Sequence, residues 1–444
     1  MITAKAFAGK HYAVYGLARS GLATVEALLA SGARVTAWDG KEDARAKAPA
    51  GAKITNLDEA DLSQFDSLVV TPGLPLNRHP IAQRARDAGV EIIGDIELFA
   101  RARPELPPHK VLGITGTNGK STTTALVHHI LKTTGVPTTT GGNIGLPILS
   151  QDPLPEGGVY VLELSSYQID LTQSLDCDVA VLLNITPDHL DRYDSFEAYA
   201  TSKARLFEMQ SERSVGYVDF QDPEARKVQE RLVQSGRDFI FILSTDGLAD
   251  LLATSNEWWD GPPTAQKDWP ALQGPHNFQN ACAAISASQA LGVSDAKIVK
   301  GLRTYSGLPH RMERIRERDG VLFVNDSKAT NAEAAAPALA AYPKVRWIVG
   351  GQAKAETLGD IAQHLGHVVR AYTIGEAGPM FERLLREAGV DAISCETLEN
   401  AVKRAAEDSQ SGETVLLSPA SASFDQFRDF EARGDRFREL VEGL

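Results

Sequence analysis

The sequence predicts an α/β protein of three domains, for three reasons. Short apolar segments alternate with segments of helical periodicity along most of the chain. This alternation is interrupted by the proline-rich residues 103–108 and restarts after residues 307–311. The chain has 444 residues with 43% hydrophobic content, which exceeds what one hydrophobic core usually serves. We therefore expect a Rossmann-like domain over residues 1–105, a central P-loop ATPase-type α/β domain over 106–307 and a Rossmann-like α/β domain over 308–444.

Residues 1–100 have the pattern that opens a doubly wound fold. Strands are predicted at 12–15, 34–38 and 68–70, with an amphipathic helix at 21–30. The loop of residues 16–21 lacks the Gly-x-Gly-x-x-Gly pattern of dinucleotide sites, but it leads to a helix N-terminus that is able to hold a diphosphate. Asp39 and Thr71 directly follow two strands, at the edge where such sheets bind ligands. Ordinary turns account for the spacing equally well.

Residues 113–124 read Gly-Ile-Thr-Gly-Thr-Asn-Gly-Lys-Ser-Thr-Thr-Thr, between a predicted strand at 110–114 and a helix from Ser121. Gly116 and Gly119 allow a tight turn that points N–H groups inward, and Lys120 can reach terminal phosphates. The Ser121 hydroxyl can hold Mg²⁺. The general phosphate-loop pattern asks for glycine where Ile114 stands, so the prediction rests on Gly-Lys-Ser in its strand-loop-helix context. This stretch predicts a nucleoside triphosphate site.

Further polar residues are expected at the same sheet edge. Glu163 ends a predicted strand at 159–163, where a Mg²⁺ ligand belongs if this strand lies beside the phosphate loop. His189 follows the next strand, although a single histidine is more often a structural hydrogen-bonding residue. Lys203 lies on a helix that starts at Ser195, and a lysine there would ordinarily be at the surface.

The composition excludes several classes of protein. A net charge of -13 argues against binding to the phosphate backbone of nucleic acid. Three widely separated cysteines argue against a disulfide framework, and we expect a reducing compartment. The sequence has neither an apolar stretch of about 18 residues nor a signal-like N-terminus. We therefore expect a cytoplasmic protein without membrane insertion. A monomer is also expected, although the composition does not bear on it.

Several motifs together resemble the Mur ligase family of amide-forming enzymes of cell-wall synthesis. They occur in order along nearly the whole chain, at residues 116–122, 163–168, 188–191, 274–277, 310–311, 325–331 and 418–427. The resemblance implies a ligase that uses ATP to join D-glutamate to UDP-N-acetylmuramoyl-L-alanine during peptidoglycan precursor synthesis. ATP would first convert the carboxylate into an acyl phosphate, which the amine would then attack through a tetrahedral intermediate.

The resemblance also implies which residues form the site. ATP would contact Gly116, Thr117, Asn118, Gly119, Lys120, Ser121, Thr122, Asn277, Arg311 and Asp326. The UDP substrate would contact Leu17, Ala18, Arg19, Asp39, Thr71, Asn143 and Gln168, and D-glutamate would contact Thr330, Lys354, Ser423 and Phe430. Two Mg²⁺ ions would be held by Ser121, Glu163, His189 and Lys203, the last as a carbamate formed with CO₂. Catalysis would depend on Lys120, His189, Lys203 and Lys328.

Alternatives stay open at this point. A P-loop kinase or ATPase that makes no amide bond would share the phosphate loop, and an NAD oxidoreductase is disfavoured by the missing glycine pattern. Within the family, a ligase for another amino acid and folylpolyglutamate synthetase are the nearest competitors. For Ser423, the competing role is an N-cap for a helix starting at Phe424, with Gln426 completing a capping box.

Overall fold

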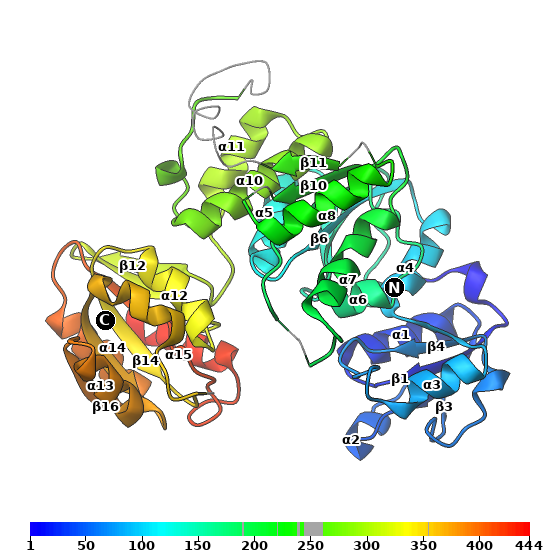
Figure 1. Cartoon of the computed structure of the whole chain (residues 1–444), viewed down its shortest axis with the longest axis horizontal. Coiled ribbons are helices and arrows are strands. Elements are labelled where there is room, and N and C mark those ends of the chain that lie inside the picture. Colours follow the sequence, from blue (N-terminus) through cyan, green and yellow to red (C-terminus); the bar gives the residue numbers. More distant parts are fainter. Residues whose placement is uncertain (189–190, 220, 238–239, 244–260, 354) are drawn as a thin grey trace. The chain divides into compact units, whose positions relative to one another are not determined.

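Figure 1 shows the computed structural model of the chain, which describes every residue except 189–190, 220, 238–239, 244–260 and 354. His189 and Lys354 therefore lie outside the described residues. The chain forms two compact units, the first of Met1–Thr264 with Gln279–Leu302 and the second of Ala265–Phe278 with Arg303–Leu444. Each unit is described by itself.

The first unit begins with a parallel sheet of order β3-β2-β1-β4-β5. Its strands are β1 (His11–Tyr15), β2 (Arg34–Trp38), β3 (Lys53–Ile54), β4 (Ser67–Val70) and β5 (Glu91–Ile93). Its helices are α1 (Arg19–Ala30), α2 (Glu42–Arg45), α3 (Pro80–Asp87) and α4 (Asp95–Ala102), with 3-10 turns at Lys5–Phe7, Leu62–Gln64 and Arg103–Glu105. The proline-rich stretch is tied down rather than free, since the Glu105 carboxylate accepts the Lys5 and Ala6 N–H groups at 2.8 and 3.0 Å.

A second parallel sheet in this unit has the order β11-β10-β9-β6-β8-β7. Its strands are β6 (His109–Thr115), β7 (Thr138–Gly142), β8 (Gly158–Glu163), β9 (Val179–Leu182), β10 (Val215–Asp219) and β11 (Ile240–Leu243). The helices are α5 (Lys120–Thr133), α6 (Ser166–Asp170), α7 (Phe196–Glu208), α8 (Pro223–Gln234) and most of α10 (Pro275–Ala290) and α11 (Asp295–Thr304), with a 3-10 turn at Ile148–Ser150. A further 3-10 turn, at Gln266–Asp268, belongs to the second unit. β6 pairs with both β8 and β9, so the loops that follow these three strands meet at one edge.

The second unit holds a sheet of order β12-β13-β17-β14-β15-β16. Its strands are β12 (Glu313–Arg318), β13 (Val321–Asn325), β14 (Val345–Gly350), β15 (Val368–Ile374), β16 (Ala392–Glu396) and β17 (Thr414–Leu417). Its helices are α12 (Ala332–Ala340), a 3-10 segment at Gly359–His367, α13 (Gly378–Glu387), α14 (Leu398–Asp408) and α15 (Phe430–Glu442). Every strand pair is parallel except β12 with β13, which places an antiparallel, charge-rich strand at one edge.

The predicted fold class is confirmed, with local differences. By itself the glycine-rich stretch of residues 141–145 indicates a turn, but Gly141 and Gly142 belong to β7. A β-carbon on Gly142 would overlap the Glu163 carbonyl, so the strand can pack only where the side chain is absent. The strands β3, β5, β12 and β16 were not predicted. The domain boundaries near 105 and 307 stay predictions.

In the part of the chain that the structure describes, no helix is both long and apolar enough to cross a membrane.

Candidate active site

The phosphate loop connects β6 to α5, as predicted. Gly116 and Gly119 have φ of 145° and 84°, in the region that favours glycine, and Gly119 is the N-cap of α5. The loop is held by Asn184 at the end of β9. Its backbone oxygen accepts the Thr117 N–H at 2.8 Å, and its side chain exchanges hydrogen bonds with the Asn118 backbone at 2.8 and 3.1 Å. The structure therefore shows a preformed anion-binding loop at a helix N-terminus.

Two lysines converge on one oxygen in this loop. Lys120 Nζ and Lys203 Nζ each donate to the Gly116 carbonyl at 2.9 Å, and Lys120 also donates to the Thr117 carbonyl at 2.7 Å. Lys203 is 1% exposed and lies 4.6 Å from the centre of the Tyr199 ring. Burial, followed by the charge of Lys120, lowers the pKa of Lys203 to about 7. Lys203 is thus not the surface lysine that its helical position alone would indicate.

Glu163 lies beside this loop, because β8 pairs with β6 and places Glu163 opposite Ile114. The side chain is 1% exposed. One oxygen, Oε1, accepts the Asn143 side-chain N–H at 3.0 Å, whereas Oε2 is buried and has no hydrogen-bond partner among the described residues. An unsatisfied buried carboxylate oxygen is costly unless a cation or a water completes it, so the site fits a metal ion.

The predicted UDP-substrate residues of the first sheet form a compact loop cluster. The Asp39 carboxylate accepts the N–H groups of Leu17 and Lys41 at 2.8 and 2.9 Å, which fixes the loop after β1. A β-carbon on Gly16 would overlap the Thr71 hydroxyl, so the loops after β1 and β4 are in close contact. Ala18 is the N-cap of α1, and its side chain makes no capping bond.

The predicted UDP-substrate residues of the second sheet connect to the same cluster. Arg19 donates to the Gly145 carbonyl at 3.2 Å, in the loop that carries Asn143, and the Asn143 N–H donates to the Glu163 carbonyl at 2.8 Å. Gln168 is buried, and its side-chain oxygen accepts from the Ser165 N–H and hydroxyl in the capping box of α6. Within the first unit, the structure thus brings predicted UDP-substrate residues next to the predicted metal ligand.

In the second unit, the loops after β13 and β17 lie side by side because these strands pair in parallel. Asp326, directly after β13, accepts the Ser418 hydroxyl at 2.7 Å and the Met312 N–H at 3.2 Å. Burial raises the pKa of Asp326 to about 7, opposed by its two hydrogen bonds and by Arg311. Arg311 and Asp326 are both predicted to contact the nucleotide, and the charge of Arg311 acts on the Asp326 carboxylate.

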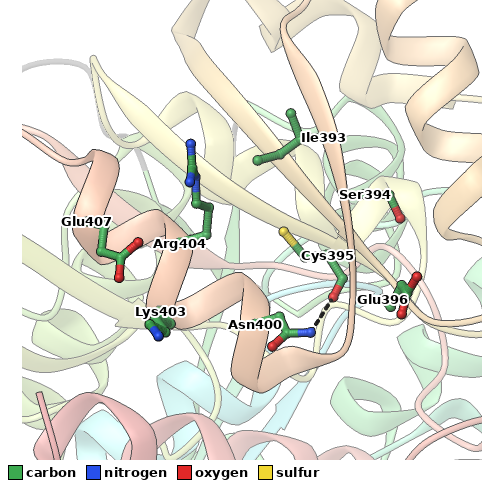
Figure 2. Close-up of a pocket in the computed structure, with 8 residues that line it drawn as sticks. All are labelled: Ile393, Ser394, Cys395, Glu396, Asn400, Lys403, Arg404 and Glu407. Atoms are coloured by element: carbon green, nitrogen blue, oxygen red, sulfur yellow. Dashed lines mark hydrogen bonds between the residues drawn. The ribbon is translucent and has the colours of Figure 1, made fainter.

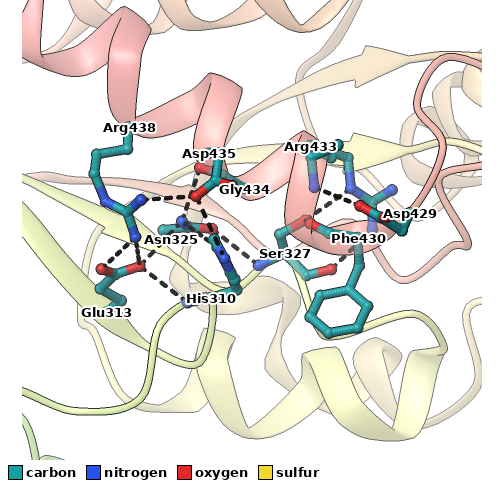
Figure 3. Close-up of polar contacts among 11 residues, drawn as sticks. His310, Glu313, Asn325, Ser327, Asp429, Phe430, Arg433, Gly434, Asp435 and Arg438 are labelled. Carbon is teal, nitrogen blue, oxygen red and sulfur yellow. Dashed lines mark hydrogen bonds and ion pairs between the residues drawn. The ribbon is translucent and has the colours of Figure 1, made fainter. Parts of the chain in front are cut away.

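Figure 3 shows how α15 joins these loops. The Ser327 hydroxyl donates to the Phe430 carbonyl at 2.9 Å. Arg433 is 1% exposed and donates to the Ser327 hydroxyl and carbonyl, each at 2.9 Å, and to the Ser421 carbonyl at 3.0 Å. Burial lowers the pKa of Arg433 to about 10. Lys328 Nζ lies 5.0 Å from the centre of the Phe430 ring. The buried Arg433 guanidinium thus joins the loop that carries Ser327 and Lys328 to the loop that carries Ser421 and Ser423.

Ser423 does not cap a helix, which corrects the competing prediction. Residues 424–426 form a turn, and the Ser423 carbonyl accepts the N–H groups of Gln426 and Phe427 at 3.1 and 2.8 Å. The nearest helix, α15, begins at Phe430 and is capped by the Asp429 side chain. The neighbouring Ala422 exchanges backbone hydrogen bonds with Gln352 at 2.8 and 3.0 Å, so the loop after β14 reaches the Ser423 loop.

A separate cavity of about 510 Å³ lies between β16 and α14 (Figure 2). It is lined by Ile393, Ser394, Cys395, Glu396, Asn400, Lys403, Arg404 and Glu407. None of these was predicted as a site residue, and the cavity therefore does not mark the predicted site.

Three residues near the phosphate loop were not predicted. Asn184 holds the loop, Tyr199 places its hydroxyl 3.1 Å from the Thr117 hydroxyl, and a β-carbon on Gly119 would overlap the Asn280 side-chain oxygen. Asn184 lies two residues after β9, which pairs with β6 before the phosphate loop, and this position was an available signal. Asn277, Arg311, Thr330, Ser423 and Phe430 belong to the second unit.

Comparison with known proteins decides the family. Three family descriptions match: "Mur ligase MurD-like, N-terminal domain" at residues 10–94, "Mur ligase middle domain" at 114–288 and "Mur ligase, glutamate ligase domain" at 310–421. The chain belongs to the Mur ligase family. Two relatives named UDP-N-acetylmuramoylalanine--D-glutamate ligase share this family. The protein of Sphingopyxis alaskensis is 57% identical, covering 100% of both chains, and that of Novosphingobium aromaticivorans is 55% identical, covering 100% of this chain and 97% of the relative.

Solved structures share the Mur ligase fold at low identity. The UDP-N-acetylmuramate-alanine ligase MurC of Thermotoga maritima is 17% identical with a TM-score of 0.56, covering 98% of this chain and 99% of that chain. Escherichia coli FolC is 19% identical with a TM-score of 0.54, covering 79% and 93%. These structures support the three-domain Mur ligase architecture.

Proposed function

We propose that this Mur ligase uses ATP to join D-glutamate to UDP-N-acetylmuramoyl-L-alanine in peptidoglycan precursor synthesis. The observation that carries this proposal is the identity of 52–57% to three relatives named for that reaction, over the full length of this chain. The phosphate loop and the loops of the second unit supply the groups that such a reaction needs.

The chemistry explains the number of donors and cations. The substrate carboxylate attacks the γ-phosphorus of ATP, ADP leaves, and an acyl phosphate forms. The D-glutamate amine then attacks the acyl carbon, loses a proton, and inorganic phosphate leaves from the tetrahedral intermediate. Both steps bring negative groups together, so positive charge and N–H donors must stabilise the transition states.

On the nucleotide, we assign Lys120 to the terminal phosphates, together with the N–H groups of residues 116–122. In the structure, Lys120 donates to the Gly116 and Thr117 carbonyls, and these hydrogen bonds hold its ammonium group against the loop. Asn277, Arg311 and Asp326 would contact the rest of ATP, and Lys328 would neutralise the phosphoryl group in transit. Leu17, Ala18, Arg19, Asp39, Thr71, Asn143 and Gln168 would bind the UDP substrate.

The Mur ligase family uses Mg²⁺ with ATP, and Mg²⁺ would supply Lewis-acid charge stabilisation at the phosphates. Ser121 and the unpaired Glu163 oxygen fit that ion. We propose two Mg²⁺ sites, the second with His189 and a carbamylated Lys203. A lysine whose pKa is lowered to about 7 is largely neutral at pH 8, and only a neutral amine reacts with CO₂.

D-Glutamate brings two carboxylates, while its amine must be neutral at attack. We assign its binding to Thr330, Lys354, Ser423 and the Phe430 region. This assignment is supported by the hydrogen bonds that join the loops of Ser327 and Ser423 through Arg433. The loop geometry leaves the Ser423 hydroxyl without a capping role, which suits a neutral donor.

Phosphate release over a panel of amino acids, with and without UDP-N-acetylmuramoyl-L-alanine, tests the proposal. We expect turnover only when D-glutamate and the UDP substrate are both present. Turnover with another amino acid would identify a different Mur-type ligase. ATP hydrolysis without any amino acid, or transfer of phosphate to another acceptor, would favour the kinase or ATPase class.

We further propose that the enzyme acts as a monomer in the cytoplasm. Its three cysteines, Cys177, Cys282 and Cys395, are free and buried, which suits a reducing compartment. Light scattering after size-exclusion chromatography would test the oligomeric state, and a mass twice that of the chain would overturn the monomer.

A further inference from the structure

Arg192, between β9 and α7, makes an unusual set of contacts that the proposed mechanism does not use. Its guanidinium donates to three consecutive carbonyls of the loop after β4, with Nη1 to Gly73 at 3.3 Å and Nη2 to Pro72 and Leu74 at 3.2 and 2.8 Å. This loop directly follows Thr71, which was assigned to the UDP substrate. One side chain thus joins the phosphate-loop sheet to the loop that carries a substrate residue.

The segment of residues 72–78 also donates hydrogen bonds to the segment of residues 191–192. Asn77 and Arg78 donate their side-chain N–H groups to the Asp191 carbonyl at 3.0 and 2.8 Å. Five hydrogen bonds therefore connect residues 72–78 with residues 191–192. Every acceptor is a backbone carbonyl, so these bonds fix the path of the chain on both sides.

On its other side, Arg192 reaches toward the phosphate loop through aromatic rings. The guanidinium carbon lies 4.3 Å from the centre of the Tyr167 ring, which stacks on Tyr193 at 6.1 Å and 13°. Tyr193 lies 5.4 Å from Tyr199. The Tyr199 hydroxyl is 3.1 Å from the Thr117 hydroxyl of the phosphate loop. A continuous series of contacts therefore runs from the loop of Thr71 to the phosphate loop.

A simple stabilising role between two sheets is the alternative, and most surface contacts of arginine have little energetic effect. Arg205 offers the comparison, since its guanidinium also donates to two backbone carbonyls, Asp170 at 3.2 Å and Thr172 at 2.9 Å. Both of those carbonyls belong to the same sheet domain as Arg205, whereas the three carbonyls bound by Arg192 lie beside Thr71. Of these two arginines, Arg192 is the one placed to align substrate residues that come from different sheets.

We propose that Arg192 is a positioning residue that fixes the Pro72–Leu74 loop, and with it Thr71, for the UDP substrate. The inference rests on the proposed function, because it takes Thr71 on one sheet and Asn143 with Gln168 on the other as parts of one substrate site. Substrate residues held in place before binding avoid an ordering cost at binding. The planar guanidinium of Arg192 donates to three carbonyls and also contacts the Tyr167 ring. A lysine ammonium cannot reproduce this set of contacts.

The test compares Arg192→Lys and Arg192→Gln with the control Arg205→Lys. Steady-state kinetics would give kcat and the KM of each substrate, calorimetry would give binding of UDP-N-acetylmuramoyl-L-alanine without turnover, and thermal unfolding would give Tm. For both Arg192 variants we expect KM and Kd for the UDP substrate to rise about 10-fold, with the KM for ATP changed less than about 3-fold. Arg205→Lys should leave the KM and Kd for the UDP substrate and the KM for ATP near the wild-type values.

Unchanged KM and Kd values for the UDP substrate in both Arg192 variants would overturn the inference. Equal weakening of all three substrates with a lowered Tm, or the same pattern in Arg205→Lys, would also overturn it, because these results describe a structural role only. Failure of the proposed function is seen separately, as absence of amide product with the wild-type enzyme.

Discussion

Lys203 provides the sharpest prediction, because two lysine amines share the Gly116 carbonyl in a buried site. With its pKa lowered from 10.5 to about 7, about 90% of this amine is neutral at pH 8, against about 0.3% at the ordinary pKa. Carbamylation should therefore occur at Lys203 in dilute bicarbonate and rise as pH increases through about 7. We expect one labelled carbamate carbon per chain by NMR with ¹³C-bicarbonate.

The control for this labelling is Lys227, which is exposed and paired with Glu224 at 2.8 Å. Lys227→Met should keep the carbamate signal and Lys203→Met should abolish it together with activity. Full activity in CO₂-depleted buffer, with no labelled carbon assigned to Lys203, would refute the reasoning.

The same pKa has a consequence for stability. The folded pKa of Lys203 lies below its unfolded value, so the unfolded chain binds more protons between pH 7 and 10.5, and stability should rise with pH in that window. The full difference corresponds to about 5 kcal/mol. Without CO₂, Lys203→Met should therefore stabilise the protein more at pH 6 than at pH 9, as measured by Tm. An equal gain at both pH values would contradict the buried, neutral lysine.

Three further changes test the site. Lys120→Ala should lower the rate of phosphate release on the order of 10²-fold or more, because it removes charge from the transferred phosphoryl group, and near-normal turnover would exclude that role. Gly119→Ala should greatly weaken ATP binding in calorimetry, because its β-carbon meets the Asn280 oxygen at a left-handed φ; unchanged affinity would show that the loop adapts. Ser423→Ala should raise the KM for D-glutamate well above the changes for ATP and the UDP substrate, and equal weakening with a lower Tm would indicate a structural role.

The fold and the phosphate loop were predictable from local patterns. Buried strands and capped helices leave short-range signals, and the start of α7 after Ser195 is an example. The residues that a side chain contacts in the folded protein were harder to predict from the sequence. Lys203 was expected at the surface from its position on a helix, but the Gly116 carbonyl that it contacts lies 87 positions earlier in the chain, in the phosphate loop.

The Ser423 segment shows a second limit. Ser and Gln three residues apart match a capping box, yet no helix follows, and the preceding residue Ala422 is hydrogen-bonded to Gln352 and Arg433 from elsewhere in the fold. Tertiary contacts therefore override a local signal here. Similarly, Gly141 and Gly142 indicate a turn in isolation, but they allow close approach of β7 to β8.

The antiparallel strand β12 has a consequence for association of the protein. An outer strand offers unpaired N–H and C=O groups to any passing chain. Here residues 313–318 read Glu-Arg-Ile-Arg-Glu-Arg, so another strand docking on this edge would have to strip water from charged side chains while burying little apolar surface. The charged side chains of β12 thus disfavour pairing of another strand with this edge, although no other element covers the edge by pairing with it. It should protect a concentrated solution of the protein against growth of fibres from this edge.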